Sequence, residues 1–361
     1  MKNKLFIDIK DKKFYKKNAD TASSKPRLDA QIIAEKMGFK SIVLYNFFLG
    51  IAASSLWIKI LYNTKILKFV NNFLFFFQAL RLYFIKNSIL FLQYPFFNKK
   101  IVSILKTLKK NNKIILLVHD LESFRSYEQR STEIGTFNLA DVLIVHSTGM
   151  KEILQENGCT SPMVILEFFD FLSDFQACKP IESNYIKVLY AGNLTKSKFI
   201  SGLNSFPTKD NHVSFYLYGR YDESLKTNDV IEYKGVFNND HIDHVEGNWG
   251  LVWDGESVNT CSGTNGEYLK LNAPFKLSLY LALGIPVIVW SKSAMAEYVK
   301  NYNLGICVDK LKDIEEYILS LVPHQIDKLE KNIKEFSQKV KSGEMLTKAV
   351  RKSLSILEDG H

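Results

Sequence analysis

Acidic residues are missing from a long part of the sequence, since none occurs between Lys36 and His119. Residues 1–113 hold 22 Lys and Arg against 5 Asp and Glu, so the positive charge is concentrated there and the remainder is slightly acidic. A one-sided basic surface predicts an anionic partner, which is nucleic acid, anionic lipid or a pyrophosphate-linked acceptor. Nucleic acid is disfavoured, because the sequence has no helix-turn-helix, RNP or zinc-finger signature and its basic residues are interleaved with apolar runs.

Cysteine is also scarce, and its placement excludes two kinds of small fold. The four cysteines are far apart and form no C-x-x-C, so neither a zinc ribbon nor a disulfide scaffold is indicated. A reducing cytoplasm is therefore the expected compartment. We expect no secretory signal, because residues 1–20 are charged throughout and contain no apolar core. The cysteines are Cys159, Cys178, Cys261 and Cys307.

Apolar runs are present but short. Residues 41–58 are uncharged, yet polar side chains interrupt them and their first part reads as a buried strand, so we do not interpret them as a membrane span. A second run, 69–80, is flanked by Lys65, Lys68 and Arg81. Two interpretations of it stay open: a helix lying in the headgroup region of an anionic membrane, and a helix covering a sheet with its lysines in solvent.

Apolar strands alternate with helical patterns along the chain, which predicts two α/β domains, each with a doubly wound parallel sheet. With 361 residues, 46% of them hydrophobic, the chain is long enough to bury two cores. We predict an N-terminal domain at 1–178, a C-terminal domain at 179–325 and a helical segment at 326–361. The expected strands are 5–9, 41–45, 88–93, 113–118, 142–146 and 163–166 in the first domain, and 186–190, 213–218, 231–233, 251–253, 286–290 and 305–308 in the second. The expected helices of the first domain are 30–37, 65–84, 98–110, 128–140 and 149–157.

The stretch 249–290 carries the strongest indication of a ligand site. An apolar strand stops at Asp254, a loop of Gly, Ser, Thr and Asn follows, and Asn272 and Pro274 open a helix. The free N–H groups at such a helix start, with the charge of Lys276 in the first turn, bind anions. The residues alone leave open an ordinary βαβ unit without a ligand.

The same stretch resembles a known family. Its pattern of P-x-K, four residues and then L-x-x-G-x-P-V-I is similar to the donor half of two-domain GT-B glycosyltransferases. More narrowly, GLVWDGESVNTCSG and GEYLKLNAPFKLSLYL resemble the bacterial β-1,6-galactofuranosyltransferases that extend lipopolysaccharide O-antigen, and their relatives that add glucose to glycoproteins such as serine-rich repeat adhesins. KPRLD at 25–29, HDLESFR at 119–125 and YAGNLTK at 190–196 extend the similarity. The resemblance implies two Rossmann-like domains facing across a cleft, with segment 326–361 packing back toward the first.

The donor site is expected in loops of the second domain, because ligands of open parallel sheets bind beyond the carboxyl ends of the strands. Gly192 allows close approach of the backbone to a phosphate, Lys196 can pair with that phosphate, and Tyr221 can stack on uracil. Asp254 is placed to bind ribose or sugar hydroxyls, and Lys276 the diphosphate. The expected donor-site residues are Gly192, Asn193, Leu194, Thr195, Lys196, Tyr218, Gly219, Tyr221, Asp254, Gly255, Asn272, Lys276 and Ser278.

The first domain is expected to supply the acceptor site and the catalytic base. Asp120 follows the strand 113–118 and so lies at the carboxyl edge of the sheet. An inverting transferase needs a carboxylate or imidazole to take the proton of the acceptor hydroxyl, and Asp120 is the leading candidate, ahead of His119 and Asp29. A helix cap on the next segment is the structural alternative for Asp120. Candidates for binding an acceptor diphosphate or closing over the donor are Lys25 and Arg27, expected in a loop after the first strand, and Arg125.

No metal is expected in the mechanism. No two aspartates stand at i and i+2, so the D-x-D that carries manganese in the other large glycosyltransferase fold is absent. The charge of the leaving group would instead be met by the helix start, Lys276 and Lys196. Many retaining GT-B enzymes have two glutamates eight positions apart around this helix, where this chain has Leu271 and Leu279, so inversion is favoured.

The resemblance implies an inverting transferase that uses UDP-galactofuranose and extends a lipid-linked surface glycan. From the residues we expect it to be cytoplasmic and to need no cofactor, and the headgroup interpretation of 69–80 would make it peripheral at the inner face of the membrane. Two alternatives stay open. One is a UDP-glucose-dependent transferase of the same fold that acts on a glycoprotein, and the other is a non-catalytic protein that binds glycan or lipid. The sequence also leaves the oligomeric state open, a homo-oligomer included.

Overall fold

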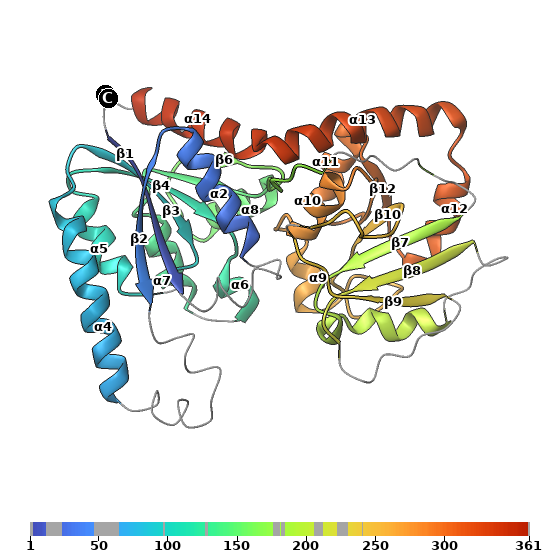
Figure 1. Cartoon of the computed structure of the whole chain (residues 1–361), viewed down its shortest axis with the longest axis horizontal. Helices are drawn as coiled ribbons and strands as arrows, with labels where there is room; N and C mark the ends of the chain where they lie inside the picture. Colours follow the sequence, from blue (N-terminus) through green and yellow to red (C-terminus); the bar gives the residue numbers. More distant parts are fainter. Residues whose placement is uncertain are drawn as a thin grey trace. The chain divides into compact units, whose positions relative to one another are not determined.

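The computed structural model describes residues 3–11, 24–46, 65–96, 98–126, 129–175, 181, 185–205, 212–221, 230–239 and 241–359. The chain forms two compact units. The first comprises Met1–Val145, Lys151–Leu166 and Leu346–His361, and the second comprises His146–Met150 and Glu167–Met345. Each unit holds one six-stranded sheet, so the prediction of two doubly wound α/β halves is confirmed (Figure 1).

The sheet of the first unit has the strand order β2-β1-β3-β4-β5-β6, and every neighbouring pair is parallel. Strand β3 is buried along its whole length, as expected for a parallel strand covered on both faces. The elements are β1 (Asn3–Asp11), α2 (Lys25–Lys36), β2 (Lys40–Asn46), α4 (Lys65–Leu80), the 3-10 helix η1 (Arg81–Phe84), β3 (Ser88–Tyr94), α5 (Ile101–Leu108), β4 (Lys113–Val118), α6 (Glu122–Ser126), α7 (Arg130–Phe137), β5 (Val142–Val145), α8 (Thr148–Glu156), β6 (Met163–Ile165) and α14 (Glu344–Asp359).

The sheet of the second unit has the order β12-β11-β10-β7-β8-β9, again with every neighbouring pair parallel. Trp249, the first residue of the central strand β10, and Trp253, the residue after its end, are fully buried. The elements are β7 (Ile186–Ala191), η2 (Leu194–Lys196), η3 (Lys198–Ser205), β8 (Val213–Tyr218), β9 (Ile231–Gly235), β10 (Trp249–Val252), α9 (Thr264–Tyr268), α10 (Phe275–Ala282), β11 (Val287–Trp290), α11 (Met295–Tyr302), β12 (Gly305–Val308), η4 (Leu311–Asp313), α12 (Ile314–Leu319) and α13 (Pro323–Ser342).

Each sheet has one point where the order of strand addition reverses. In the first sheet this switch point lies between β1 and β3, and in the second it lies between β7 and β10. Doubly wound sheets bind ligands at such switch points, beyond the carboxyl ends of the strands. These two places are therefore where the functional residues of each unit are to be sought.

The observed strands agree with the predicted ones to within two residues at each end, but helix α2 does not. It was expected at 30–37 and begins at Lys25, because Pro26 lies in its first turn, where a missing N–H costs no hydrogen bond. The prediction that Lys25 and Arg27 lie in a loop is therefore wrong. Both are in the first helical turn, and both are buried.

The predicted strand at 41–45 is part of β2, and the rest of the uncharged run, from residue 47 onward, falls outside the described residues. Among the helices that the structure describes, none combines the length and the apolar character needed to cross a bilayer.

Candidate active site

The switch point of the second sheet holds a buried charged cluster. Lys276 Nζ lies 2.5 Å from Asp254 Oδ1, and it also donates to the Tyr190 hydroxyl at 3.2 Å. Tyr190 is the last residue but one of β7, Asp254 lies two residues after the end of β10, and Lys276 lies in the first turn of α10, so all three elements around the switch point contribute. The ammonium also lies 4.4 Å from the centroid of the Tyr190 ring, a cation–π contact.

This cluster keeps Lys276 charged. Burial by itself would lower the pKa of Lys276, but the charge of Asp254 and the neighbouring Tyr190 and Tyr280 hydroxyls outweigh burial and raise that pKa. Burial raises the pKa of Tyr190, so its hydroxyl is neutral and can donate. Only 12% of the Lys276 side chain is exposed, against 27% of Asp254, so the charge sits in a place of low dielectric with one open side.

Tyr280 joins the two strands of the switch point. Its hydroxyl accepts from Ala191 N at 3.0 Å and donates to Leu251 O at 3.1 Å. The ring packs directly on Gly250, where an added Cβ would lie 2.2 Å from Tyr280 Cγ. Tyr280 therefore fixes helix α10, and with it Lys276, against the sheet.

Two glycines bring the loops after β7 and β8 together. Gly219 has φ +143°, and a Cβ there would lie 1.8 Å from the Gly192 carbonyl oxygen. Gly192 N donates to Tyr218 O at 3.0 Å, which holds the two loops in contact. Asn193 caps η2, because its side chain accepts from Lys196 N at 3.2 Å. The loop after β7 therefore has a fixed backbone, and its contact with a phosphate stays a prediction.

The start of α10 differs from the prediction. The N-cap is Pro274, and Asn272 does not cap the helix: its Oδ1 is buried, and among the described residues it has no hydrogen-bond partner. Instead, His146 Nδ1 accepts from Ala273 N at 3.1 Å. His146 belongs to the second unit by its contacts and is 127 positions away from Ala273 in the sequence, so the sequence could not indicate this partner.

The remaining predicted donor residues have mixed environments. Tyr218 is buried and its hydroxyl accepts from Glu246 N at 2.9 Å, so it supports the fold. Tyr221 is 41% exposed and packs edge-on against Tyr233, with ring centroids 4.3 Å apart. Thr195 and Lys196 are exposed, whereas Leu194, Gly255 and Ser278 are buried. The sequence did not single out Tyr190 or Tyr280, although Tyr280 stands four residues after Lys276 and so shares its helix face.

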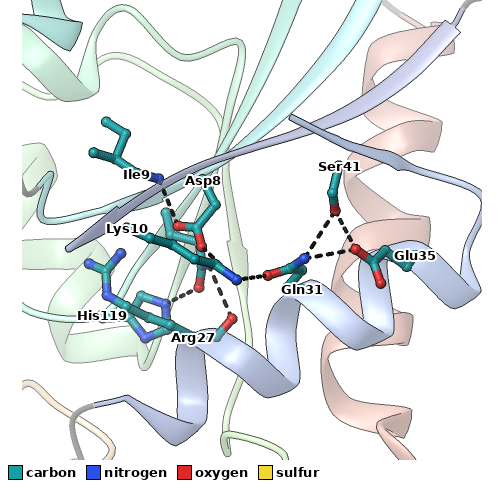
Figure 2. Close-up of polar contacts among 9 residues, drawn as sticks. Asp8, Ile9, Lys10, Arg27, Gln31, Glu35, Ser41 and His119 are labelled. Atoms are coloured by element: carbon teal, nitrogen blue, oxygen red, sulfur yellow. Dashed lines mark hydrogen bonds and ion pairs between the residues drawn. The ribbon is translucent and has the colours of Figure 1, made fainter. Parts of the chain in front are cut away.

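The switch point of the first sheet holds a second polar cluster, which Figure 2 shows in close-up. Asp8 near the end of β1 is buried; its Oδ1 accepts from Ile9 N at 2.9 Å, and its Oδ2 lies 3.9 Å from Lys10 Nζ. Lys10 also donates to Gln31 of α2 at 2.7 Å, and Gln31 continues the network to Glu35. This network fixes α2 beside the carboxyl end of β1.

His119 lies in the same cluster and is oriented by Gln93. Gln93 Nε2 donates to Arg27 O at 3.3 Å, so the amide oxygen of Gln93 faces His119 Nε2, at 2.7 Å. An amide oxygen only accepts, so His119 Nε2 carries a hydrogen, and in the neutral ring the lone pair is then on Nδ1. That tautomer is the one in which Nδ1 can accept a proton or a hydrogen bond from a hydroxyl.

The other candidates of the first unit are distributed around this cluster. Asp29 is buried and paired with Lys25, whose Nζ lies 3.1 Å from Asp29 Oδ1 one helical turn away. Arg27 donates to Pro95 O at 2.5 Å. Asp120 follows His119 after β4 and is partly exposed. Arg125 lies in α6, and its side chain falls outside the described residues.

Beside the carboxyl end of β3, a cavity of about 520 Å³ opens in the first unit. Its walls combine the aromatic rings of Tyr94 and Phe96 with the carboxylates of Glu122 and Glu133. Glu133 is held by Tyr94 Oη and by Glu122 N, each at 2.8 Å. Aromatic faces beside hydrogen-bonding groups suit a sugar ring. Within the described ranges, no three His, Cys, Asp or Glu side chains are grouped so that they could hold a metal ion.

Comparison with known proteins places the chain in a family. The model for the N-terminal domain of glucosyltransferase 3-like proteins matches residues 12–168, and the model for their C-terminal domain matches residues 188–353. The chain is 30% identical over 237 residues to beta-1,6-galactofuranosyltransferase WbbI of Escherichia coli (strain K12), covering 64% of this chain and 68% of that protein. It is 26% identical over 253 residues to glucosyltransferase 3 of Streptococcus gordonii, covering 68% of this chain and 72% of that protein.

Solved structures agree on the fold. Sucrose-phosphate synthase from Thermosynechococcus elongatus superposes with a TM-score of 0.59 at 13% identity, over 99% of this chain and 100% of that one. The lipopolysaccharide outer core galactosyltransferase WaaB, in its apo form, superposes with a TM-score of 0.57 at 12% identity, over 97% of this chain and 99% of that one. The chain therefore belongs to the glucosyltransferase 3-like family, together with the bacterial β-1,6-galactofuranosyltransferases, and is a glycosyltransferase of the GT-B fold.

Proposed function

We propose that this protein transfers galactofuranose from UDP-galactofuranose to a lipid-linked or surface-glycan acceptor, with inversion at the anomeric carbon and without a metal ion. The observation that carries the transferase chemistry is the Lys276–Asp254–Tyr190 cluster at the switch point of the second sheet. The choice of sugar rests on the 30% identity to a galactofuranosyltransferase. The reducing cytoplasm fits the three described cysteines, Cys159, Cys261 and Cys307, which are all free; Cys178 falls outside the described residues.

In this proposal the second unit binds the donor. The charge of Lys276 and the N–H groups at the start of α10 stabilise the negative charge that develops on the departing UDP. Asp254 holds Lys276 in place and has its open side available for a sugar or ribose hydroxyl. A preorganised cation of this kind replaces the metal ion in neutralising the diphosphate. We therefore propose that chelators leave the rate unchanged.

The first unit supplies the base. The oxygen of the acceptor hydroxyl attacks the anomeric carbon, the bond from that carbon to the UDP oxygen breaks, and the electron pair leaves with UDP. Asp120 takes the hydroxyl proton, and neutral His119 accepts a hydrogen bond through Nδ1 from a neighbouring hydroxyl of the acceptor, which orients the acceptor. An α-linked donor then gives a β-furanoside, because attack comes from the face opposite UDP.

The test of this function measures UDP release from purified protein. UDP-galactofuranose with a glycan acceptor should release UDP faster than UDP-glucose does, and the product should be β-linked by NMR. UDP alone should raise the unfolding temperature, because it binds only the folded state. The 26% identity to glucosyltransferase 3 makes UDP-glucose the second candidate donor. If UDP neither protects the protein nor appears as product, the protein is a binding protein and the transferase proposal is wrong.

Gln93 gives a prediction about pH. The change Gln93→Glu places a carboxylate on His119 Nε2, which favours the imidazolium over the neutral ring. Because His119 must be neutral in this mechanism, the acidic limb of the kcat/KM profile should move to higher pH, by about one pH unit. The uncharged variant Gln93→Met is the control, and should lower the rate without moving the limb. An acidic limb that stays in place in Gln93→Glu contradicts a role for neutral His119.

A further inference from the structure

Helix α4 has two apolar faces. Phe75 and Ala79 face inward and are buried, which attaches the helix to the first unit. On the other side, Phe69, Phe73, Phe76 and Phe77 follow the spacing i, i+4, i+7 and i+8, which places them along one helix face. All four are exposed, by 68%, 51%, 49% and 54%. With Phe84 of η1, which is 83% exposed, they form what we call the aromatic ridge.

The four rings of the ridge that lie on α4 are contiguous. Phe69 stacks on Phe73 with centroids 6.2 Å apart, Phe73 meets Phe77 edge-on at 4.6 Å, and Phe76 lies 6.3 Å from Phe77. Single exposed apolar side chains are common on protein surfaces, but a contiguous aromatic patch marks an interaction site. A helix on the surface of a globular protein usually has polar residues on the face that is exposed to water, whereas α4 has phenylalanines there.

Charge decides which partner fits. Residues 37–118, which include the ridge, contain 12 Lys and Arg and no Asp or Glu. Arg81 and Lys86 stand on either side of Phe84, and both are exposed. A second copy of this chain would bring a like-charged surface against the ridge, which is unfavourable. An anionic bilayer offers negative charge to the basic side chains beside the ridge and an apolar interior to the phenyl rings.

We propose that the aromatic ridge docks on an anionic lipid bilayer. The phenyl rings enter the boundary between headgroups and acyl chains, while the cationic side chains beside them pair with lipid phosphates. Helix α4 then lies along the membrane surface, and the binding weakens with salt. This docking does not depend on which sugar is transferred, so it can be tested without any nucleotide sugar.

The experiment uses the full chain and sedimentation with vesicles of phosphatidylcholine, with or without phosphatidylglycerol. We expect binding to the anionic vesicles at low salt, and little to the neutral ones. The double change Phe73→Ser with Phe77→Ser should weaken the partition at least about tenfold, because it removes two rings from the bilayer. The matched control changes two apolar residues of α12 with similar exposure, Tyr317→Ser with Leu319→Ser, and should bind like the unchanged protein.

Further measurements separate the possible outcomes. Lys86→Glu should reduce binding to anionic vesicles and flatten its salt dependence. All variants should unfold at about the same temperature, since only exposed side chains change, and should keep their activity on a soluble acceptor. Equal binding to neutral and anionic vesicles, or full binding by the ridge variant, overturns the proposal. So does a ridge variant that changes from dimer to monomer in sedimentation velocity while vesicle binding stays the same, because a second copy then covers the ridge.

Discussion

Replacing Lys276 with alanine should weaken UDP binding by about 30- to 1000-fold, since one partner of a desolvated charge pair is worth about 2–4 kcal/mol to a ligand that needs it. The lysine is only 12% exposed and is held between Asp254 and Tyr190, so water cannot fully replace its charge. Isothermal titration with UDP measures the loss. Lys276→Arg keeps the charge and should retain part of the affinity.

Lys276→Ala should also lower the free energy of unfolding, and a double variant can separate this effect from the loss of UDP binding. Without Lys276, the Asp254 carboxylate is left partly buried without its counter-charge, which costs about 1–3 kcal/mol of unfolding free energy after allowance for its 27% exposure. The double variant Lys276→Met with Asp254→Asn removes that charge and should recover most of the stability. It should not recover UDP binding. If the double variant binds UDP like the unchanged protein, Lys276 has only a structural role.

Replacing Asp120 with asparagine should lower kcat by about two to four powers of ten, as the loss of a general base requires, and should leave UDP affinity nearly intact. Stopped-time assays of UDP release give kcat, and titration with UDP gives the affinity. Asp29→Asn is the matched control. Asp29 is buried and paired with Lys25, so its replacement should affect stability more than turnover.

The variants of Asp120 and His119 together can contradict the assignment of Asp120 as the base. If Asp120→Asn keeps its turnover while His119→Ala loses it, the base is His119, acting through the Nδ1 lone pair that Gln93 fixes. If both variants lose turnover to a comparable extent, and the acidic limb moves in Gln93→Glu, Asp120 takes the proton and His119 orients the acceptor through a neighbouring hydroxyl.

Local patterns in the sequence predicted much of the fold. The β-strands follow from short apolar runs bounded by Gly, Asn and Asp, and the position of Lys276 follows from the Pro-x-Lys at a helix start. Helix α2 was misplaced because the proline at 26 reads as a breaker unless it falls in the first turn, where it is tolerated.

Contacts between distant residues could not be predicted in the same way. Tyr190 and Lys276 are 86 positions apart, and the His146 that accepts from Ala273 N is 127 positions away. Lys276 and Asp254 were expected to bind separate parts of the donor, but in the structure they form one ion pair. Such pairings depend on which strands become neighbours at a switch point, and strand order is a property of the whole sheet.

The contact between Gly250 and the Tyr280 ring has an evolutionary consequence. No side chain fits at position 250 while a large ring occupies position 280, because the nearest ring atom lies 2.2 Å from where a Cβ would begin. Among relatives, these two positions should therefore vary together: wherever 250 gains a side chain, 280 should shrink. Such a lineage would also lose the hydroxyl that ties Ala191 to Leu251, so it would need another way to hold the helix that corresponds to α10 against its sheet.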